Sequence, residues 1–227
     1  MALRAARPLL ECLDRAGRAS TPVTNEHVNN KEKERTMKKA LSAGFASLML
    51  TAALSAPASA LTVDGVEVPD TYQAMGTELK LNGAGTRSKW FMDLYVGGLY
   101  VPESVNDGEA VINADEPQAI TLHIISGMIT SERMTEATMD GFEASTHGNT
   151  APIQDDIDRF MAVFQEEIKE GDVFDLVYLP GQGVRVLKNG EYKDTVGDLA
   201  FKKALFGIWL SDKPAQKDLK QKMLGKR

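Results

Sequence analysis

Apolar residues recur at every second position through much of the chain after residue 60, a period typical of β-strands. The longest such run is 90–101, whose even positions are mostly apolar while its odd positions combine Phe91, Tyr95 and Leu99 with Asp93. Shorter runs of the same kind lie on either side of it. The pattern predicts strands over 62–69, 78–82, 90–101 and 119–126, with Asp64-Gly65 forming a turn inside the first.

The apolar period changes to that of a helix from Ser131 onward. Ser131 is the predicted N-cap of a first helix, and a second helix follows in which Pro152 suits the first turn and Gly171 the end. The second helix carries one apolar stripe, made of Ile153, Ile157, Phe160, Met161, Phe164 and Ile168. A pair of helices is therefore expected between two groups of strands.

Strand patterns return over 173–179, 183–188 and 192–196, and Asn189-Gly190 is typical of a two-residue hairpin turn between the last two. A short helix capped by Asp198 and a last helix from Pro214 to about Leu224 complete the pattern. This order of strands, helix pair, hairpin and helices favours an α+β fold, with an antiparallel sheet and helices packed on one side.

The segment 37–60 has the composition of a secretory signal peptide. Two lysines precede an apolar run that is shorter than a typical transmembrane helix, and Ala58-Ser59-Ala60 is a typical cleavage site. Leu61 follows in place of a lipoprotein cysteine, so we expect a periplasmic protein cleaved after Ala60 with one domain over 61–227. Residues 1–36 are interpreted as a disordered extension from an upstream start, with an organelle transit sequence as the alternative.

The segment 61–227 is acidic and has no cysteine. Cys12 precedes the predicted cleavage site, so neither a disulfide nor thiol chemistry is expected. The segment carries 17 Lys and Arg against 27 Asp and Glu, a formal charge of −10. This excess of negative charge argues against nucleic acid and anionic membrane surfaces as partners.

The stretch "GAGTRSKWFMDLYVGGLYV", residues 83–101, places polar groups in an apolar setting. On one straight strand Arg87 and Tyr95 would lie about 26 Å apart, too far to share a small ligand. If the chain reverses near 87–89, the two side chains converge, and a guanidinium beside a phenol makes a good carboxylate site. The alternative is a solvated turn arginine and a core tyrosine, and the spacing alone leaves both interpretations open.

Together with "ALFGIWLSDKPAQKDLKQKMLG" near the C-terminus, this stretch resembles the chalcone isomerase-like superfamily, especially its bacterial exported members. The resemblance covers nearly all of 61–227. It implies an open-faced β-sandwich, in which a curved antiparallel sheet has helices packed on one face and a ligand cleft between them. In that family the arginine after Gly-x-Gly-x holds a flavonoid anion in the enzymes or, with a nearby tyrosine, a carboxylate in the fatty-acid-binding members. Arg87 occupies this position.

One segment departs from the pattern of the flavonoid enzymes, which have Tyr-Ser-x-Lys-Val-x-x-Asn at the start of the first long helix. Here the segment reads "TSERMTEA", so Thr130 replaces the tyrosine and Ala137 the asparagine. The candidate ligand-binding residues are Arg87, Tyr95 and Thr130, from the resemblance, and Phe91, from its place on the same face of the strand as Tyr95; no catalytic residue is assigned. Phe91 is open to two interpretations, as a core residue or as a contact to an apolar ligand.

The other polar candidates have structural explanations. His123 is expected to be a structural histidine on a strand and not a general base. His147 is expected at the end of a helix, where its charge interacts favourably with the helix dipole. Asp155, Asp156 and Asp158 suit the positive end of a helix dipole better than a cation site. No metal-ligand spacing, phosphate loop or nucleophile arrangement is found, so no metal and no cofactor are expected.

The sequence therefore predicts a periplasmic protein that binds a fatty-acid-like or aromatic carboxylate anchored by Arg87. The alternative is an isomerase (intramolecular lyase) of another substrate, in which Arg87 stabilises an oxyanion; activity on chalcones is not expected. A third hypothesis is a module that binds a periplasmic protein partner.

Overall fold

The computed structural model describes residues 60–226. The predicted extension 1–36 and signal peptide 37–60 lie outside the described residues, except for Ala60, which begins the first strand.

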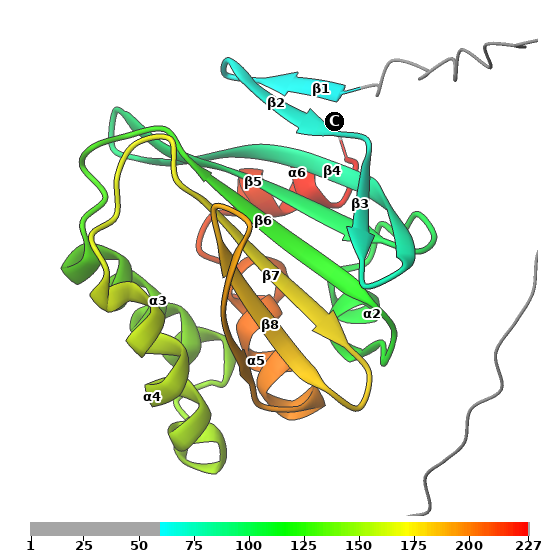
Figure 1. Cartoon of the computed structure of the whole chain (residues 1–227), viewed down its shortest axis with the longest axis vertical. Helices are drawn as coiled ribbons and strands as arrows, with labels where there is room; N and C mark the ends of the chain where they lie inside the picture. The colour runs from blue at the N-terminus through cyan, green and yellow to red at the C-terminus, as the bar shows by residue number, and fades with distance from the viewer. Residues whose placement is uncertain (1–59, 227) are drawn as a thin grey trace, which may run out of the picture. The chain divides into compact units, whose positions relative to one another are not determined.

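Seven antiparallel strands form one sheet in which neighbours along the chain are also neighbours in space (Figure 1). A separate antiparallel hairpin precedes the sheet, and its turn has the positive φ angles of Asp64 and Gly65, 45° and 82°. The hairpin is β1 (Ala60–Val63) and β2 (Val66–Pro69); the sheet is β3 (Thr71–Ala74), β4 (Thr77–Lys89), β5 (Met92–Val101), β6 (Gln118–Ile124), β7 (Val173–Leu179), β8 (Gly183–Lys188) and β9 (Glu191–Val196). The antiparallel α+β prediction is confirmed.

The helices differ from the prediction mainly at their ends. The second predicted helix is broken into a helix with a 3₁₀ turn on either side and ends before Ile168, whereas the helix capped by Asp198 runs five residues past its predicted end at Leu205. The N-cap of the first long helix is Thr130, not Ser131. The helices are α2 (Gly108–Asn113), α3 (Ser131–Ser145), η1 (Ala151–Ile153), α4 (Gln154–Ala162), η2 (Val163–Gln165), α5 (Leu199–Leu210) and α6 (Lys217–Met223).

The two faces of the sheet bury two separate apolar clusters, because side chains alternate along each strand. On β6, Ile120, Leu122 and Ile124 face the helices and join the larger cluster. Ala119, just before them in the strand, joins the smaller cluster, which also contains Val68 of the β1–β2 hairpin. In Figure 1, α5 and α6 lie behind the sheet and α3 and α4 lie to one side.

The contact between α6 and β4 explains the glycines of the Gly-Ala-Gly stretch. A Cβ atom on Gly83 would lie 2.1 Å from the Lys222 carbonyl oxygen, and one on Gly85 would lie 2.7 Å from the Lys222 Cβ. Neither distance is compatible with a side chain, so the glycines permit α6 to rest directly on the strand. Helix α6 is therefore the element that requires glycine at positions 83 and 85.

A buried lysine completes the C-terminal end of α2. The Nζ atom of Lys202, on α5, donates to the carbonyl oxygens of Val111, Ile112 and Ala114 at 2.6, 3.1 and 2.9 Å. Carbonyls at the end of a helix have no partner within the helix, and a cation there also meets the negative end of its dipole. The three bonds satisfy the ammonium group, although Lys202 is 0% exposed.

Replacing Lys202 with Met should lower the free energy of unfolding by about 3 kcal/mol, because three buried carbonyls lose their donor. The melting temperature should fall by about 10 °C, measured by circular dichroism. Lys203→Met is the matched control, since Lys203 is partly exposed and should change stability by less than about 0.5 kcal/mol. Equal effects of the two substitutions would contradict the capping role.

Candidate functional site

A cavity of about 730 Å³ lies between the helix-covered face of the sheet and the helices α3, α4 and α5. Its walls are mainly apolar and include Leu122, Leu176 and Phe174 from the sheet. Phe160 of α4 and Phe164 of η2, both from the predicted apolar stripe, also line the cavity. The cavity therefore offers an apolar interior that spans both layers of the fold.

Arg87, near the end of β4, lines this cavity and is half-buried. Its Nη1 donates to the Ser88 carbonyl oxygen at 2.7 Å and to the Gln216 Oε1 at 3.1 Å. The same Gln216 oxygen accepts the Ser88 backbone N–H at 2.8 Å, so one amide fixes both the strand and the guanidinium. Both partners of Arg87 are neutral, and within residues 60–226 no carboxylate lies within 4.0 Å of its nitrogens. The guanidinium charge is therefore not neutralised by the protein.

Tyr95 lies directly opposite Arg87 in the pairing of β4 with β5. Burial raises the pKa of the Tyr95 phenol, while the hydrogen bond from Trp209 and the nearby Arg87 charge oppose the rise. The Trp209 Nε1 donates to the Tyr95 hydroxyl at 2.9 Å. Over 60–226 no acceptor is found for the hydroxyl proton of Tyr95, which leaves a neutral phenol able to donate to a ligand.

A β-bulge turns two consecutive residues of β5 toward the cavity. Arg87 pairs with Tyr95 but Ser88 pairs with Asp93, so Leu94 is an extra residue on β5. Both Leu94 and Tyr95 line the cavity, which regular alternation would not allow. The bulge thus places an apolar and a polar side chain at the same end of the cavity.

The structure brings together two of the four predicted ligand-binding residues. Arg87 and Tyr95 meet across adjacent strands, because the chain reverses at Trp90-Phe91, just after the predicted 87–89. Phe91 lies on this turn, is fully exposed and does not line the cavity. Thr130 is exposed, accepts the Arg133 backbone N–H at 3.3 Å as the N-cap of α3, and does not line the cavity either.

Two residues that contact the Arg87 and Tyr95 pair were not singled out from the sequence. Trp209 is part of the long apolar run of α5, where it looks like any core residue. Gln216 precedes α6 in a polar segment. Both lie within "ALFGIWLSDKPAQKDLKQKMLG", so the second resemblance motif was the one available indication of them.

The remaining polar candidates lie away from the cavity. His123 is on the opposite face of β6, where burial lowers its pKa. His147 follows α3 with φ 53° and lies 3.7 Å from an Asp212 oxygen. Asp155 and Asp156 occupy the first turn of α4, as expected. In the described part of the chain no group of three or more His, Cys, Asp or Glu could hold a metal ion.

Replacing Tyr95 with Phe should lower stability at neutral pH by about 1–3 kcal/mol, because the buried Trp209 N–H loses its acceptor. The raised pKa of Tyr95 also has a consequence in alkali. The unfolded phenol ionises near pH 10 whereas the folded one stays protonated, so this stability is present below about pH 10 and is lost as pH rises toward the folded pKa.

Urea unfolding at pH 7 and between about pH 10 and 11 measures both effects. From pH 10 to pH 11 the variant should lose about 1 kcal/mol less than the wild type, because the unfolded phenol is about half ionised at pH 10. Tyr192→Phe, on a half-exposed side chain, should change stability at pH 7 by less than about 0.5 kcal/mol. An alkaline slope unchanged by Tyr95→Phe would show that this phenol is not the protected group.

The fold and the cavity can be compared with those of known proteins. Residues 60–225 match the sequence model of a family described as chalcone isomerase-like. No curated protein sequence matches the chain. Among solved structures, the fatty-acid binding protein of Arabidopsis thaliana superposes with a TM-score of 0.57 at 17% identity, over 70% of this chain and 92% of that one. At this identity the likeness concerns the fold, which confirms the predicted curved antiparallel sheet with helices on one face. The chain belongs to the chalcone isomerase-like family.

Proposed function

We propose that this protein binds an apolar carboxylate, either fatty-acid-like or aromatic, with Arg87 and Tyr95 holding the carboxylate group. The observation that carries the proposal is a guanidinium without a carboxylate partner, beside a buried phenol, in an otherwise apolar cavity. The signal-peptide pattern of 37–60 supports the further proposal that the protein acts in the periplasm.

The polar end of the cavity suits a carboxylate in charge and in geometry. Nη1 of Arg87 is engaged by Ser88 and Gln216, which leaves Nη2 and Nε to form the two parallel bonds that a carboxylate accepts. The Tyr95 hydroxyl supplies a third donor. Because Gln216 and Trp209 already hold the two anchor residues in place, little side-chain entropy remains to be lost on binding.

The walls of the cavity suit a hydrocarbon or aromatic body. A volume of about 730 Å³ lies within the range of small-molecule sites, and its lining is dominated by apolar side chains. Each methylene group that leaves water contributes about 0.8 kcal/mol. The fatty-acid-binding activity named for the Arabidopsis thaliana structure supports the same class of ligand.

The alternative isomerase function has less support from the lining of the cavity. Thr130, which would have to replace the missing tyrosine, is outside the lining, and Ala137 presents only a methyl group there. A substrate in the cavity would meet few polar groups besides Arg87, Tyr95 and the charged side chains around the opening. These observations favour binding over catalysis.

Replacing Arg87 with Gln should weaken binding of a long-chain fatty acid by about tenfold or more, because two charge-assisted hydrogen bonds are lost. The melting temperature should change by no more than about a few degrees, since the partners of Arg87 are neutral. Isothermal titration calorimetry with delipidated protein measures the affinity.

The matched control is Arg185→Gln, on the opposite face of the sheet, where the guanidinium stacks over Tyr192. Arg185→Gln should leave the affinity unchanged. Equal affinity in the wild type and the Arg87 variant would refute the anchor.

Replacing Gln216 with Ala should weaken the same binding by less than the Arg87 substitution does, about threefold to tenfold, because Arg87 keeps its charge but loses a positioning partner. Gln216→Glu strengthens the contact that Gln216→Ala removes. A carboxylate at this position would pair with Arg87 and compete with the ligand. The Glu variant should therefore bind more weakly than the Ala variant. The reverse order would show that Gln216 does not act through Arg87.

A further inference from the structure

Four of the large apolar side chains that the fold leaves exposed line the cavity or, in the case of Phe91, lie between two lining residues in the chain. They are Trp90, Phe91, Met92 and Met128, with exposed fractions of 85%, 102%, 42% and 42%, and they are called the apolar rim below. Trp90 comes from the β4–β5 turn, Met92 begins β5, Met128 comes from the loop before α3, and all three line the cavity. Phe91 is fully exposed and Trp90 nearly so, which means that neither ring is part of a core.

The turn that carries the rim has an unfavourable residue for its geometry. Lys89 pairs with Met92, so Trp90 and Phe91 alone form the turn, and Trp90 has a φ of 65°. The first position of such a two-residue turn favours glycine, and a bulky side chain there is strained. The geometry of the turn does not call for two exposed aromatic rings, which makes Trp90 and Phe91 candidates for a contact outside the domain.

Basic side chains surround the rim. Lys89, Arg133 and Lys213 are exposed and line the cavity, and none of them forms an ion pair within residues 60–226. Including Arg87, the lining has four basic residues against two acidic ones, Glu136 and Asp140 on α3. The opening of the cavity is therefore positive in a domain whose formal charge is −10 over 61–227.

We infer that the apolar rim docks on the surface of an anionic phospholipid bilayer. Aromatic rings at a protruding turn suit the interface between headgroups and acyl chains, and the three basic residues suit the phosphate groups beside it. Among residues 60–226 no helix is long and apolar enough to cross a membrane, and the proposed contact is confined to the surface. In this orientation the cavity opens toward the bilayer, so a carboxylate could pass between lipid and protein without crossing water. That last step rests on the proposed function, whereas the docking itself does not.

The test is co-sedimentation of the purified protein with vesicles of phosphatidylglycerol and phosphatidylcholine, compared with vesicles of phosphatidylcholine alone. The wild type should partition onto the anionic vesicles, and its tryptophan emission should shift to shorter wavelength. Of the two tryptophans, Trp209 is already buried at 5% exposure, so the shift reports mainly on Trp90.

Trp90→Gly and Phe91→Ser should each reduce partition onto anionic vesicles by about tenfold, because a large apolar side chain no longer enters the interface. Trp90→Gly should keep or raise the melting temperature, since glycine suits a φ of 65°. This combination separates lost docking from lost folding.

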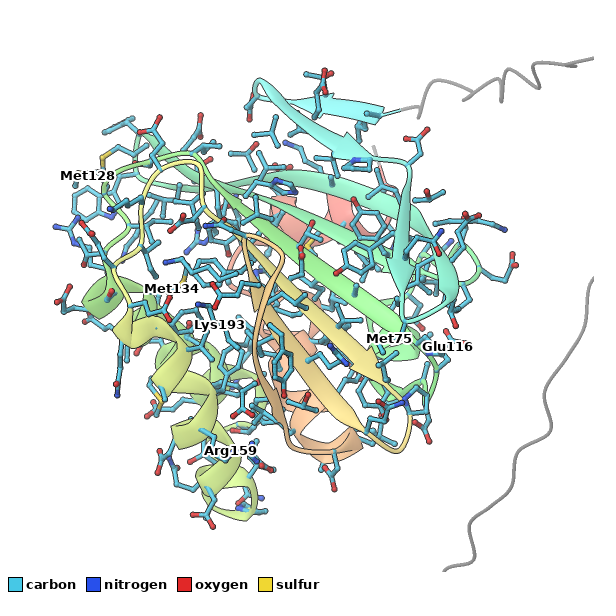
Figure 2. All side chains as sticks on the ribbon, in the orientation of Figure 1. Met75, Glu116, Met128, Met134, Arg159 and Lys193 are labelled. Atoms are coloured by element: carbon cyan, nitrogen blue, oxygen red, sulfur yellow. The ribbon has the colours of Figure 1, made fainter. Side chains whose placement is uncertain are left out.

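The chain offers a matched control at the other edge of the domain. Met75 is 64% exposed, has a φ of 50° and also lies in a two-residue hairpin turn, between β3 and β4. Figure 2 shows Met75 and Met128 on opposite sides of the domain. Met75→Gly should leave vesicle partition unchanged.

Several results would overturn the inference. The wild type could fail to partition onto anionic vesicles, or it could partition equally onto neutral ones. Met75→Gly and Trp90→Gly could reduce vesicle partition equally. The wild type could also be an oligomer in the absence of vesicles that Trp90→Gly converts to a monomer. The last result would identify the rim as a contact between copies of the chain.

Failure of docking and failure of the proposed function give different results. Phe91→Ser should lose vesicle partition but keep affinity for a soluble carboxylate, because Phe91 does not line the cavity. Arg87→Gln should do the reverse. If neither the wild type nor Phe91→Ser binds the carboxylate while vesicle partition persists, the proposed function fails and the docking stands.

Discussion

The direct contact of α6 with β4 determines the position of Arg87, the proposed ligand anchor. The strand has no side chain at Gly83 or Gly85, which allows the helix backbone to reach it. Asn82, the bulged residue just before them, donates to the carbonyl oxygens of Met223 and Val105 and accepts the Val105 N–H, all at 2.8 Å. These bonds fix the end of α6, and the residue that begins the helix, Gln216, then lies beside Arg87. A larger residue at Gly83 would move the helix, and Gln216 with it.

Lys202 and Arg87 show how the number of unused hydrogen-bond donors distinguishes a structural cation from a candidate binding group. Lys202 and Arg87 both have neutral oxygen partners in place of carboxylates. The ammonium of Lys202 has three donors and three acceptors and is closed off from solvent, so nothing more can bind to it. The guanidinium of Arg87 has five donors, uses one nitrogen, and borders a cavity. Unused donors beside empty space, and not burial of a charge by itself, distinguish the candidate site.

The sequence predicted most strands well because the spacing of apolar residues along a strand follows directly from which faces of the sheet are buried. The strands 173–179 and 183–188 have the predicted ends, and the Asn189-Gly190 turn has the positive φ angles that favour those residues. The short elements β3 and α2 were not predicted, since four to six residues contain too little of either period to be recognised. The fold class depends on the long elements, so these omissions did not change it.

The site was less predictable than the fold, because its geometry depends on one extra residue. Counting alternate positions from Tyr95 puts Phe91 on the same face, which was the basis for including it in the site. The bulge at Leu94 and the turn at Trp90-Phe91 break that count, and Phe91 points into solvent. A bulge adds a residue without altering the composition around it, so sequence periodicity cannot reveal it. Arg87 and Tyr95 line one cavity as expected, since their convergence was inferred from a chain reversal and not from counting positions.

The net charge of the domain does not predict how one local part of its surface interacts. A formal charge of −10 over 61–227 argued against anionic surfaces, and this is sound for the molecule seen from far away. At physiological ionic strength, however, exposed charges farther apart than about 8 Å are largely screened from each other. A surface in contact with the cavity opening therefore interacts mainly with Lys89, Arg133 and Lys213, and much less with carboxylates elsewhere on the domain. The negative remainder would then oppose contact through any other face, so the same net charge that disfavours general adhesion would orient the protein with its cavity toward the lipid.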